Sequence, residues 1–244
     1  MRFPDAYALR RESPKETIIF AASQLMGSRA RQEDYFLNFN DECFVVADGV
    51  GSLPNGDTAA KLASETAVWA YKHIRQHRYY WLDKKLFMKR IFRSTNLAVW
   101  QKRREKGFEE GLATTLMVLM VGPKHIWLGT AGDSSAWLFR DGEMTKLTHD
   151  KSEFQDIPPH VLGVQRLGLV PEFLTSPFDE GDVILLTTDG VGDYLTVQDM
   201  QTCVTSVGSR MEDVTNSVVS VLRAAQTNGS DENMTAVIVK RLPK

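Results

Sequence analysis

Three separate apolar runs of the sequence end on an aspartate beside a turn. The runs read FVVADG, LGTAGD and ILLTTDG, and they place Asp48, Asp133 and Asp189 at the ends of three predicted strands. A single Asp-Gly pair after a strand is usually only a turn. Two further acidic pairs, Glu33–Asp34 and Asp231–Glu232, lie at the edges of other predicted strands. Because strand ends gather at the edges of a sheet, we expect these five acidic positions to converge.

Converging carboxylates repel one another unless cations lie between them. Oxygen ligands without histidine or cysteine favour hard ions, so the pattern predicts Mg²⁺ or Mn²⁺. Gly49, directly after Asp48, leaves room for a backbone carbonyl to approach an ion as well. Arg29 lies four residues before Glu33, and its planar guanidinium suits a phosphate. Metal ligands beside an arginine indicate metal-assisted hydrolysis of a phosphoester.

The order of predicted elements favours a single α+β domain over residues 1–244. Short turns such as VGPKH and RDGE join strand-like runs and are typical of antiparallel hairpins. Neither an apolar leader nor a run long enough to span a bilayer is present, which favours a cytoplasmic protein without a membrane partner. Strands are predicted at 17–23, 34–40, 42–48, 113–122, 125–132, 135–142, 143–149, 182–190 and 234–242, and helices at 58–78, 83–107, 197–206 and 211–226.

Charge is distributed unevenly along the chain. Residues 72–106 hold twelve Lys or Arg against two acids, a net charge of +10, whereas the whole chain has −2 and the remainder therefore −12. An acidic body without a nucleic-acid motif predicts cations, and no nucleic acid, as partners. The basic helices within 72–106 are a possible docking face, although most such stretches are only solvated. Residues 150–180 contain four prolines and are predicted to form a loop-rich region.

Six motifs carry a resemblance to a known family. They read GSRARQED, VVADGVGS, TAGDSSAWLF, KLTHDKS, DVILLTTDGVGDYLT and SDENMTAVIV, in this order along nearly the whole chain. The ordered set resembles the metal-dependent Ser/Thr protein phosphatases of type 2C. Val50 stands where animal members often have histidine, which favours a bacterial-type member.

The resemblance implies a four-layer sandwich, with two antiparallel β-sheets flanked by pairs of α-helices. It also implies two bridged Mn²⁺ or Mg²⁺ ions, with a possible third, and hydrolysis of phosphoserine or phosphothreonine in proteins by a metal-bridged hydroxide. A phosphorylated protein, opposing a Ser/Thr kinase, is the implied partner. Carried over position by position, the implied metal ligands are Asp48, Gly49, Asp133, Asp189, Asp193 and one acid of Asp231 and Glu232, and the implied catalytic residues are Arg29, Glu33 and Asp34.

The segment SDENMT departs from the family's Asp-Asn-x-Thr. Strict register makes Glu232 the ligand, whereas a small bulge would bring in Asp231, whose shorter side chain suits the ion. Two other functions stay open at this point: a non-catalytic module that keeps the fold, and a phosphatase of a small phosphoester. The loop-rich region 150–180 should discriminate between substrates, because it is expected to shape the rim of the site.

Overall fold

The computed structural model describes residues 18–76, 83–149 and 161–243. Four parts of the predictions lie outside these ranges: the first residue of the first strand, Arg78 of the basic stretch, the end of KLTHDKS and the first part of the loop-rich region. The chain divides into two compact units. Unit 1 comprises Met1–Gln32, Ser135–His149 and Phe178–Lys244, and unit 2 comprises Glu33–Ser134 and Asp150–Pro177. The single domain over residues 1–244 therefore stays a prediction.

Unit 1 contains a five-stranded antiparallel sheet in the order β1-β10-β9-β6-β7. The register pairs Leu25 with Met234 at one end of β1, and Ala236 with Thr187 across β10 and β9. Its central strands are buried, apolar runs, as expected where both faces of a strand are covered. The strands are β1 (Ile18–Leu25), β6 (Ser135–Arg140), β7 (Glu143–Lys146), β9 (Val183–Thr187) and β10 (Met234–Arg241).

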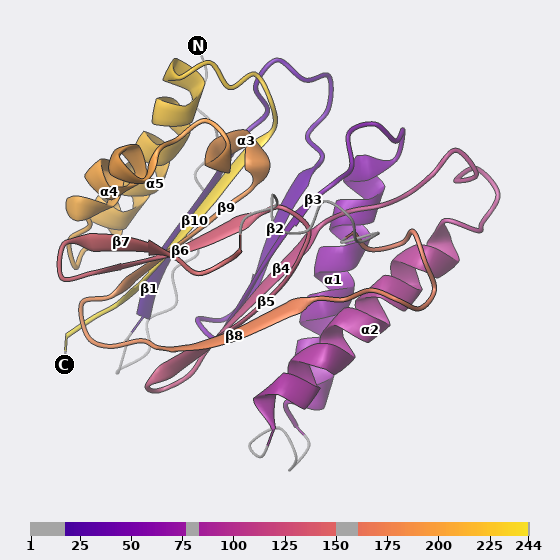
Figure 1. The fold of residues 1–244 in the computed structure, drawn as a ribbon, viewed down its shortest axis with the longest axis horizontal. Helices are drawn as coiled ribbons and strands as arrows, with labels where there is room; N and C mark the ends of the chain where they lie inside the picture. The colour runs from indigo at the N-terminus through magenta and orange to yellow at the C-terminus, as the bar shows by residue number, and fades with distance from the viewer. Residues whose placement is uncertain (1–17, 77–82, 150–160, 244) are drawn as a thin grey trace. The chain divides into compact units, whose positions relative to one another are not determined.

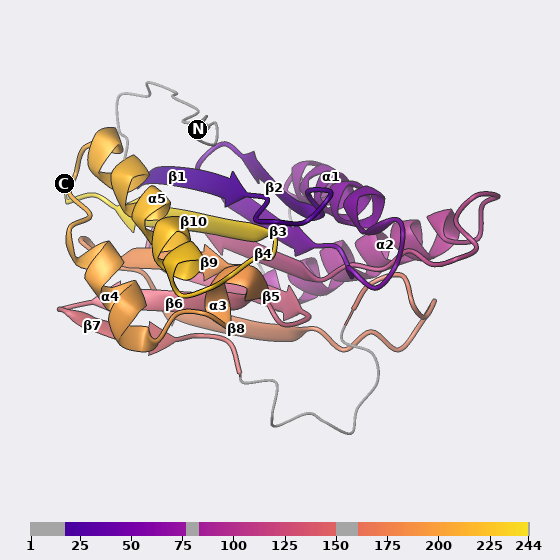
Figure 2. The same ribbon diagram turned by 90° about the horizontal axis from the view of Figure 1, so that it is seen from above.

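Three helices accompany this sheet, and Figure 2 shows α5 running beside β1 and β10. They are α3 (Asp189–Gly192), α4 (Val197–Thr205) and α5 (Met211–Thr227). A capping box fixes the start of α4, where Thr196 and Asp199 exchange side-chain-to-backbone hydrogen bonds. The buried stripe of α5 packs with Ile19 and Ile238 into one apolar cluster. Burial of this stripe holds α5 in place, because isolated helices of such length are marginal in water.

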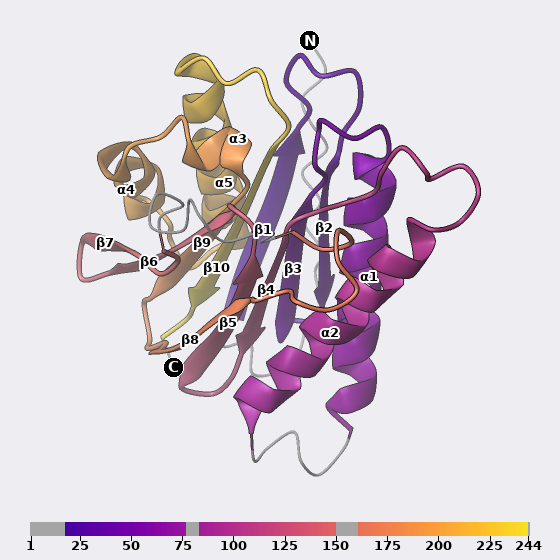
Figure 3. The ribbon, with the colours of Figure 1, turned by 45° about the vertical axis from the view of Figure 1, so that its right-hand side comes forward.

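Unit 2 contains a second antiparallel sheet, in the order β2-β3-β4-β5-β8. Neighbouring strands β2 to β5 follow one another in sequence, and Figure 3 shows them side by side with β8 beyond β5. The register places Asp34 opposite Asp48, so two acids from the sequence motifs meet at one end of the sheet. The strands are β2 (Asp34–Phe39), β3 (Cys43–Asp48), β4 (Leu116–Val121), β5 (His125–Ala131) and β8 (Glu172–Pro177).

Helices α1 (Gly56–Ile74) and α2 (Lys84–Lys102) pack against each other on one face of this second sheet (Figure 1). The buried side of α1 is rich in alanine, which allows the helix to approach the sheet closely. The Asp83 side chain caps α2 by accepting a hydrogen bond from the Leu86 amide at 2.8 Å. None of the helices in the described ranges has the length and apolar character needed to cross a bilayer.

The two antiparallel sheets with their helices confirm the predicted α+β class. Two details of the prediction are wrong. The strand β8 lies inside the region that was predicted to be loop, because its pairing with β5 supplies order that its own half-exposed residues do not signal. Helix α1 begins at Gly56 with Asn55 as its N-cap, and not at residue 58 as predicted.

Candidate metal centre

Asp48 is the last residue of β3, and hydrogen bonds fix its backbone on both sides. Its amide donates to the Thr115 hydroxyl at 3.0 Å, and its carbonyl accepts from the Thr115 amide at 2.8 Å. The Thr114 hydroxyl donates to the same carbonyl at 2.8 Å. The carboxylate of Asp48 is thereby carried on a rigid strand end, which is where a metal ligand is best placed.

Gly49 begins the turn that follows β3, and Glu33, which directly precedes β2, contacts this turn. The Gly49 amide donates to the Glu33 carbonyl at 3.0 Å, and a β-carbon at Gly49 would collide with the backbone of Gly56. The Glu33 carboxylate lies over this turn, with Oε2 3.3 Å from the point where a Gly51 β-carbon would be. Any side chain at position 49 would therefore push the turn after β3 away from the start of α1 at Gly56.

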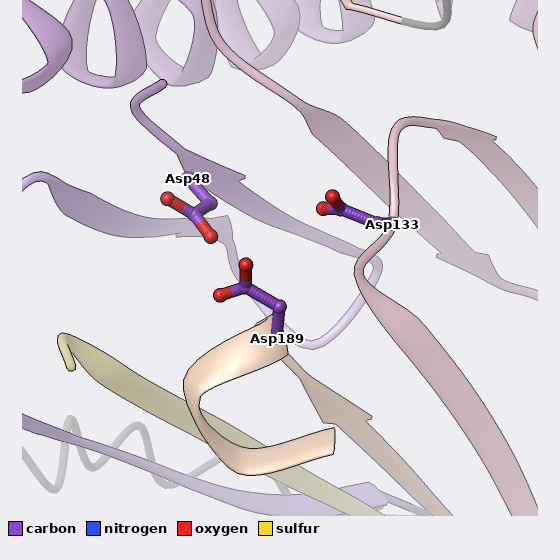
Figure 4. A group of neighbouring side chains, drawn as sticks. All are labelled: Asp48, Asp133 and Asp189. Atoms are coloured by element: carbon purple, nitrogen blue, oxygen red, sulfur yellow. The ribbon is translucent and has the colours of Figure 1, made fainter. Parts of the chain in front are cut away.

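Asp133 follows β5 and belongs to the same unit as Asp48. One carboxylate oxygen of Asp48 and one of Asp133 lie within 4.8 Å of each other (Figure 4). Two oxygens at this separation fit the coordination shell of one divalent ion, whose bonds to oxygen measure about 2.0–2.6 Å. The Thr115 and Ser134 hydroxyls lie 3.4 Å apart, so Thr115 contacts the backbone of Asp48 and the neighbour of Asp133.

In unit 1, Asp189 is the first residue of α3, as Figure 4 also shows. The preceding Thr188 is tied to β10, because its amide donates to the Thr235 carbonyl at 3.1 Å and its hydroxyl accepts from the Thr235 amide at 3.0 Å. The Ser230 hydroxyl donates to the Gly190 carbonyl at 2.7 Å. The position of Asp189 is therefore set by the hydrogen bonds of its neighbour Thr188 to β10 as well as by α3.

Arg29 forms an ion pair with Glu232, with 3.1 Å between Nη2 and Oε1. The neighbouring acid, Asp231, contacts the same loop through Ser28, whose amide donates to the Asp231 carbonyl at 2.9 Å. The buried Asn233 side chain donates to the carbonyls of Met26 and Arg31 at 2.9 and 3.0 Å. These bonds hold the loop with Arg29 against the segment that contains both candidate ligands.

Four acids of unit 1 surround Tyr194 and define a negative region. Partial desolvation and then the charges of Glu232, Asp231, Asp189 and Asp193 raise the pKa of the Tyr194 hydroxyl. Arg29 forms an ion pair with one of these four acids, Glu232. A region with this excess of carboxylates attracts cations.

Thr115, Ser28 and Asn233 position the site, and none of them was predicted from the sequence. Thr115 lies in an apolar strand run, where a threonine attracts no attention because it has high β-propensity. Adjacent threonines at the start of a buried strand, ATTLMV, are the signal that could have found it, because buried hydroxyls need hydrogen-bond partners.

The model of the family "Protein phosphatase 2C" matches residues 27–237. This chain therefore belongs to the protein phosphatase 2C family, as its motifs predict. Among its relatives, the serine/threonine phosphatase stp of Listeria welshimeri is 23% identical over 226 residues, which are 83% of this chain and 85% of the relative. Protein phosphatase PhpP of Streptococcus pneumoniae is 24% identical over 241 residues, which are 86% of this chain and 92% of the relative.

Solved structures share the fold. The catalytic domain of the serine threonine protein phosphatase PstP, in complex with two manganese ions, aligns with a TM-score of 0.75 at 22% identity, over 93% of this chain and 99% of that domain. A bacterial serine phosphatase aligns with a TM-score of 0.75 at 19% identity, over 92% of this chain and 98% of that phosphatase. The predicted fold family is confirmed.

Proposed function

We propose that this chain hydrolyses phosphoserine and phosphothreonine in proteins, as a single phosphatase domain that requires Mn²⁺ or Mg²⁺. The observation that carries the proposal is the match to the protein phosphatase 2C family, because it spans the acids singled out by chemistry alone. The separation of the Asp48 and Asp133 oxygens, within 4.8 Å, supports a divalent ion at this end of β3.

The proposed ligands of two ions are Asp48, the Gly49 carbonyl, Asp189 and one acid of Asp231 and Glu232. Asp133 and Asp193 are proposed for a third ion. Carboxylates on strand ends that are fixed by hydrogen bonds, as Asp48 is by Thr115, hold an ion without reorganisation of the backbone. When bound, such ions lower the pKa of water and neutralise charge on the phosphoryl group.

The remaining roles belong to three residues near these ligands. Arg29 binds two phosphate oxygens with its planar guanidinium, for which it exchanges its present partner, Glu232. Asp34 is 2% exposed and paired in register with Asp48, which suits it to orient a water molecule beside that ligand. Glu33, whose carboxylate covers the turn after β3, is placed to hold a further water.

The partner we propose is a phosphorylated protein whose kinase phosphorylates Ser or Thr, and not a nucleic acid or a membrane. The proposed location is the cytoplasm. The basic helices within 72–106 are the proposed docking face, because their charge is opposite to that of a phosphorylated segment.

The test is hydrolysis of a phosphothreonine peptide by purified protein. Activity should vanish in chelator and return with Mn²⁺ or Mg²⁺. Asp48→Asn and Asp189→Asn should each lose at least ~10²-fold in kcat/KM, because each removes a charge that holds the ions. The matched control is Asp141→Asn in the exposed β6–β7 turn, where a φ of 51° is as acceptable to asparagine as to aspartate.

Two outcomes would contradict the proposal. Full activity after verified removal of metal would exclude the ions from the reaction. Absence of activity toward phosphopeptides, with hydrolysis of a small phosphoester retained, would replace the protein substrate by a small molecule.

A further inference from the structure

A cavity of about 680 Å³ lies in unit 2, between α2 and residues 166–173. Lys85, Lys89 and Arg93 line it from α2, and Arg166 lines it from the other wall. None of the described residues that line the cavity is acidic. Neither the family motifs nor the proposed catalytic residues include any part of it.

The wall opposite α2 is built into the fold by one buried amide. Asn96 is 3% exposed; its side chain accepts from the Gly163 amide at 3.0 Å and donates to the carbonyls of Gln165 and Arg166 at 2.9 and 3.2 Å. Three hydrogen bonds from one side chain thus fix this segment on α2. The cavity is therefore preformed, which lowers the entropic cost of binding.

Aromatic side chains form part of the lining and secure one of the cations. The rings of Phe92 and Phe173 meet edge to face, with 5.7 Å between centroids. The Arg166 guanidinium lies over the Trp100 ring, 5.6 Å from its centroid. Such contacts between a cation and a ring limit the motion of the arginine while leaving its charge available.

The three cations on α2 are spaced regularly. Lys85, Lys89 and Arg93 follow one another at intervals of four residues, so they share one face of the helix with about 6 Å between successive positions along its axis. All three are exposed, and none forms an ion pair with an acid in the described part of the chain. Across the cavity, Leu167 and Val170 are 68% and 62% exposed.

An extended peptide presents every second side chain on the same side, about 6.6–6.8 Å apart. This repeat matches the spacing of the cations, and the intervening side chains then face Leu167 and Val170. We propose that the cavity binds an extended segment in which acidic residues alternate with apolar ones. This inference rests on the proposed function: the segment belongs to the phosphoprotein substrate and docks outside the metal centre.

The spacing of the cations favours a peptide over a nucleotide. Adjacent phosphates concentrate their negative charge at one end of a ligand, whereas these cations extend over two turns of α2. In addition, a purely anionic ligand would make no favourable contact with the exposed apolar wall. A cavity of this volume is within the range of about 300–1,000 Å³ that is typical of small-ligand pockets, and it accommodates a short segment.

The test is fluorescence anisotropy with an unphosphorylated, labelled peptide that contains Asp-Leu-Asp-Val-Asp. A peptide of the same composition with its three aspartates adjacent is the ligand control. The variant is Lys89→Glu, and the matched control is Arg90→Glu, an exposed neighbour on the same helix that does not line the cavity. The alternating peptide should bind more tightly than its control, and Lys89→Glu should weaken binding about tenfold, against less than about twofold for Arg90→Glu.

Three results would overturn the inference. One is equal binding of the two peptides, and another is an equal effect of the two variants, because a long-range field alone would then explain the attraction. The third is preferential binding of ATP or of anionic vesicles with the same dependence on Lys89. Lys89→Ala, which introduces no repulsion, should still weaken binding of the alternating peptide measurably.

The same variants separate this inference from the proposed function. Lys89→Glu should leave hydrolysis of p-nitrophenyl phosphate unchanged while raising KM for a phosphopeptide that carries the alternating segment. If the wild-type protein hydrolyses no phosphoester, the proposed function fails, yet anisotropy still decides whether the cavity binds the peptide.

Discussion

Gly190, the residue after Asp189, lies where the start of α3 meets the segment before β10. A β-carbon there would overlap the Asn233 carbonyl oxygen and would lie 3.1 Å from the carbonyl carbon of Asn233 and 3.2 Å from the β-carbon of Glu232. Backbone atoms cannot rotate away as a flexible side chain can. Gly190→Ala must therefore displace α3 or the segment that contains Asp231 and Glu232.

The size of the effect follows from two opposing contributions. Overpacking of this kind costs about 1–3 kcal/mol, and strain in the hydrogen bond from Ser230 to the Gly190 carbonyl adds about 1 kcal/mol. Alanine regains up to about 1 kcal/mol through its lower conformational entropy in the unfolded chain. We expect a net loss of about 2 kcal/mol in the free energy of unfolding, which corresponds to a Tm lower by about 4–8 °C in a protein of this size.

The matched control is Gly192→Ala, two residues further along α3. A β-carbon at Gly192 would make contacts of 3.5 Å or more, so the substitution should leave Tm unchanged or raise it slightly. Differential scanning calorimetry measures both. Displacement of Asp189 should also raise the Mn²⁺ concentration needed for half-maximal activity in Gly190→Ala. Equal Tm values for the two variants would show that the close approach of Gly190 and Asn233 does not constrain the fold.

Three further predictions concern individual side chains. Arg29→Ala should lower kcat/KM for a phosphopeptide while leaving Mn²⁺ affinity nearly intact, with Arg29→Lys restoring it only partly; an unchanged kcat/KM would remove Arg29 from phosphate binding. In Mn²⁺ titrations, Asp231→Ala should raise the metal requirement far more than Glu232→Ala, and a severe defect in Glu232→Ala alone would assign the ligand by motif register. Burial raises the pKa of the Cys43 thiol, and desolvation raises that of Cys203. Because both thiols then carry less thiolate at pH 8 than a free cysteine, iodoacetamide should modify Cys43 only after urea unfolding, and rapid native labelling detected by mass spectrometry would contradict its burial.

The acidic residues at the strand ends could be predicted because each follows a long apolar run. Such a run indicates a buried strand from the local sequence alone. Strand β8 could not, since its order comes from pairing with β5 and not from its own composition. The pairing of Arg29 with Glu232 also escaped prediction, because the two residues lie at opposite ends of the sequence and charge type alone does not select a partner. For the same reason, Thr115 was missed: its hydrogen bonds to Asp48 depend on the register of β3 and β4.

The sheet of unit 1 imposes an order of events on folding. Strand β10 lies between β1 and β9, and the pair Gln24 and Thr235, which bond side chain to side chain, are 211 positions apart. A nascent chain leaving the ribosome can pair β2 to β5 early, because these strands are sequential neighbours. By contrast, β1 emerges before β2 and must wait for β10, which follows the other described strands in the sequence. Contacts so distant in sequence form slowly, so β1 presents an apolar strand without its partner until β10 has been synthesised. Such edges invite aggregation and chaperone capture. Expression yield should therefore depend more strongly on substitutions in β10 than on equally buried substitutions in β3.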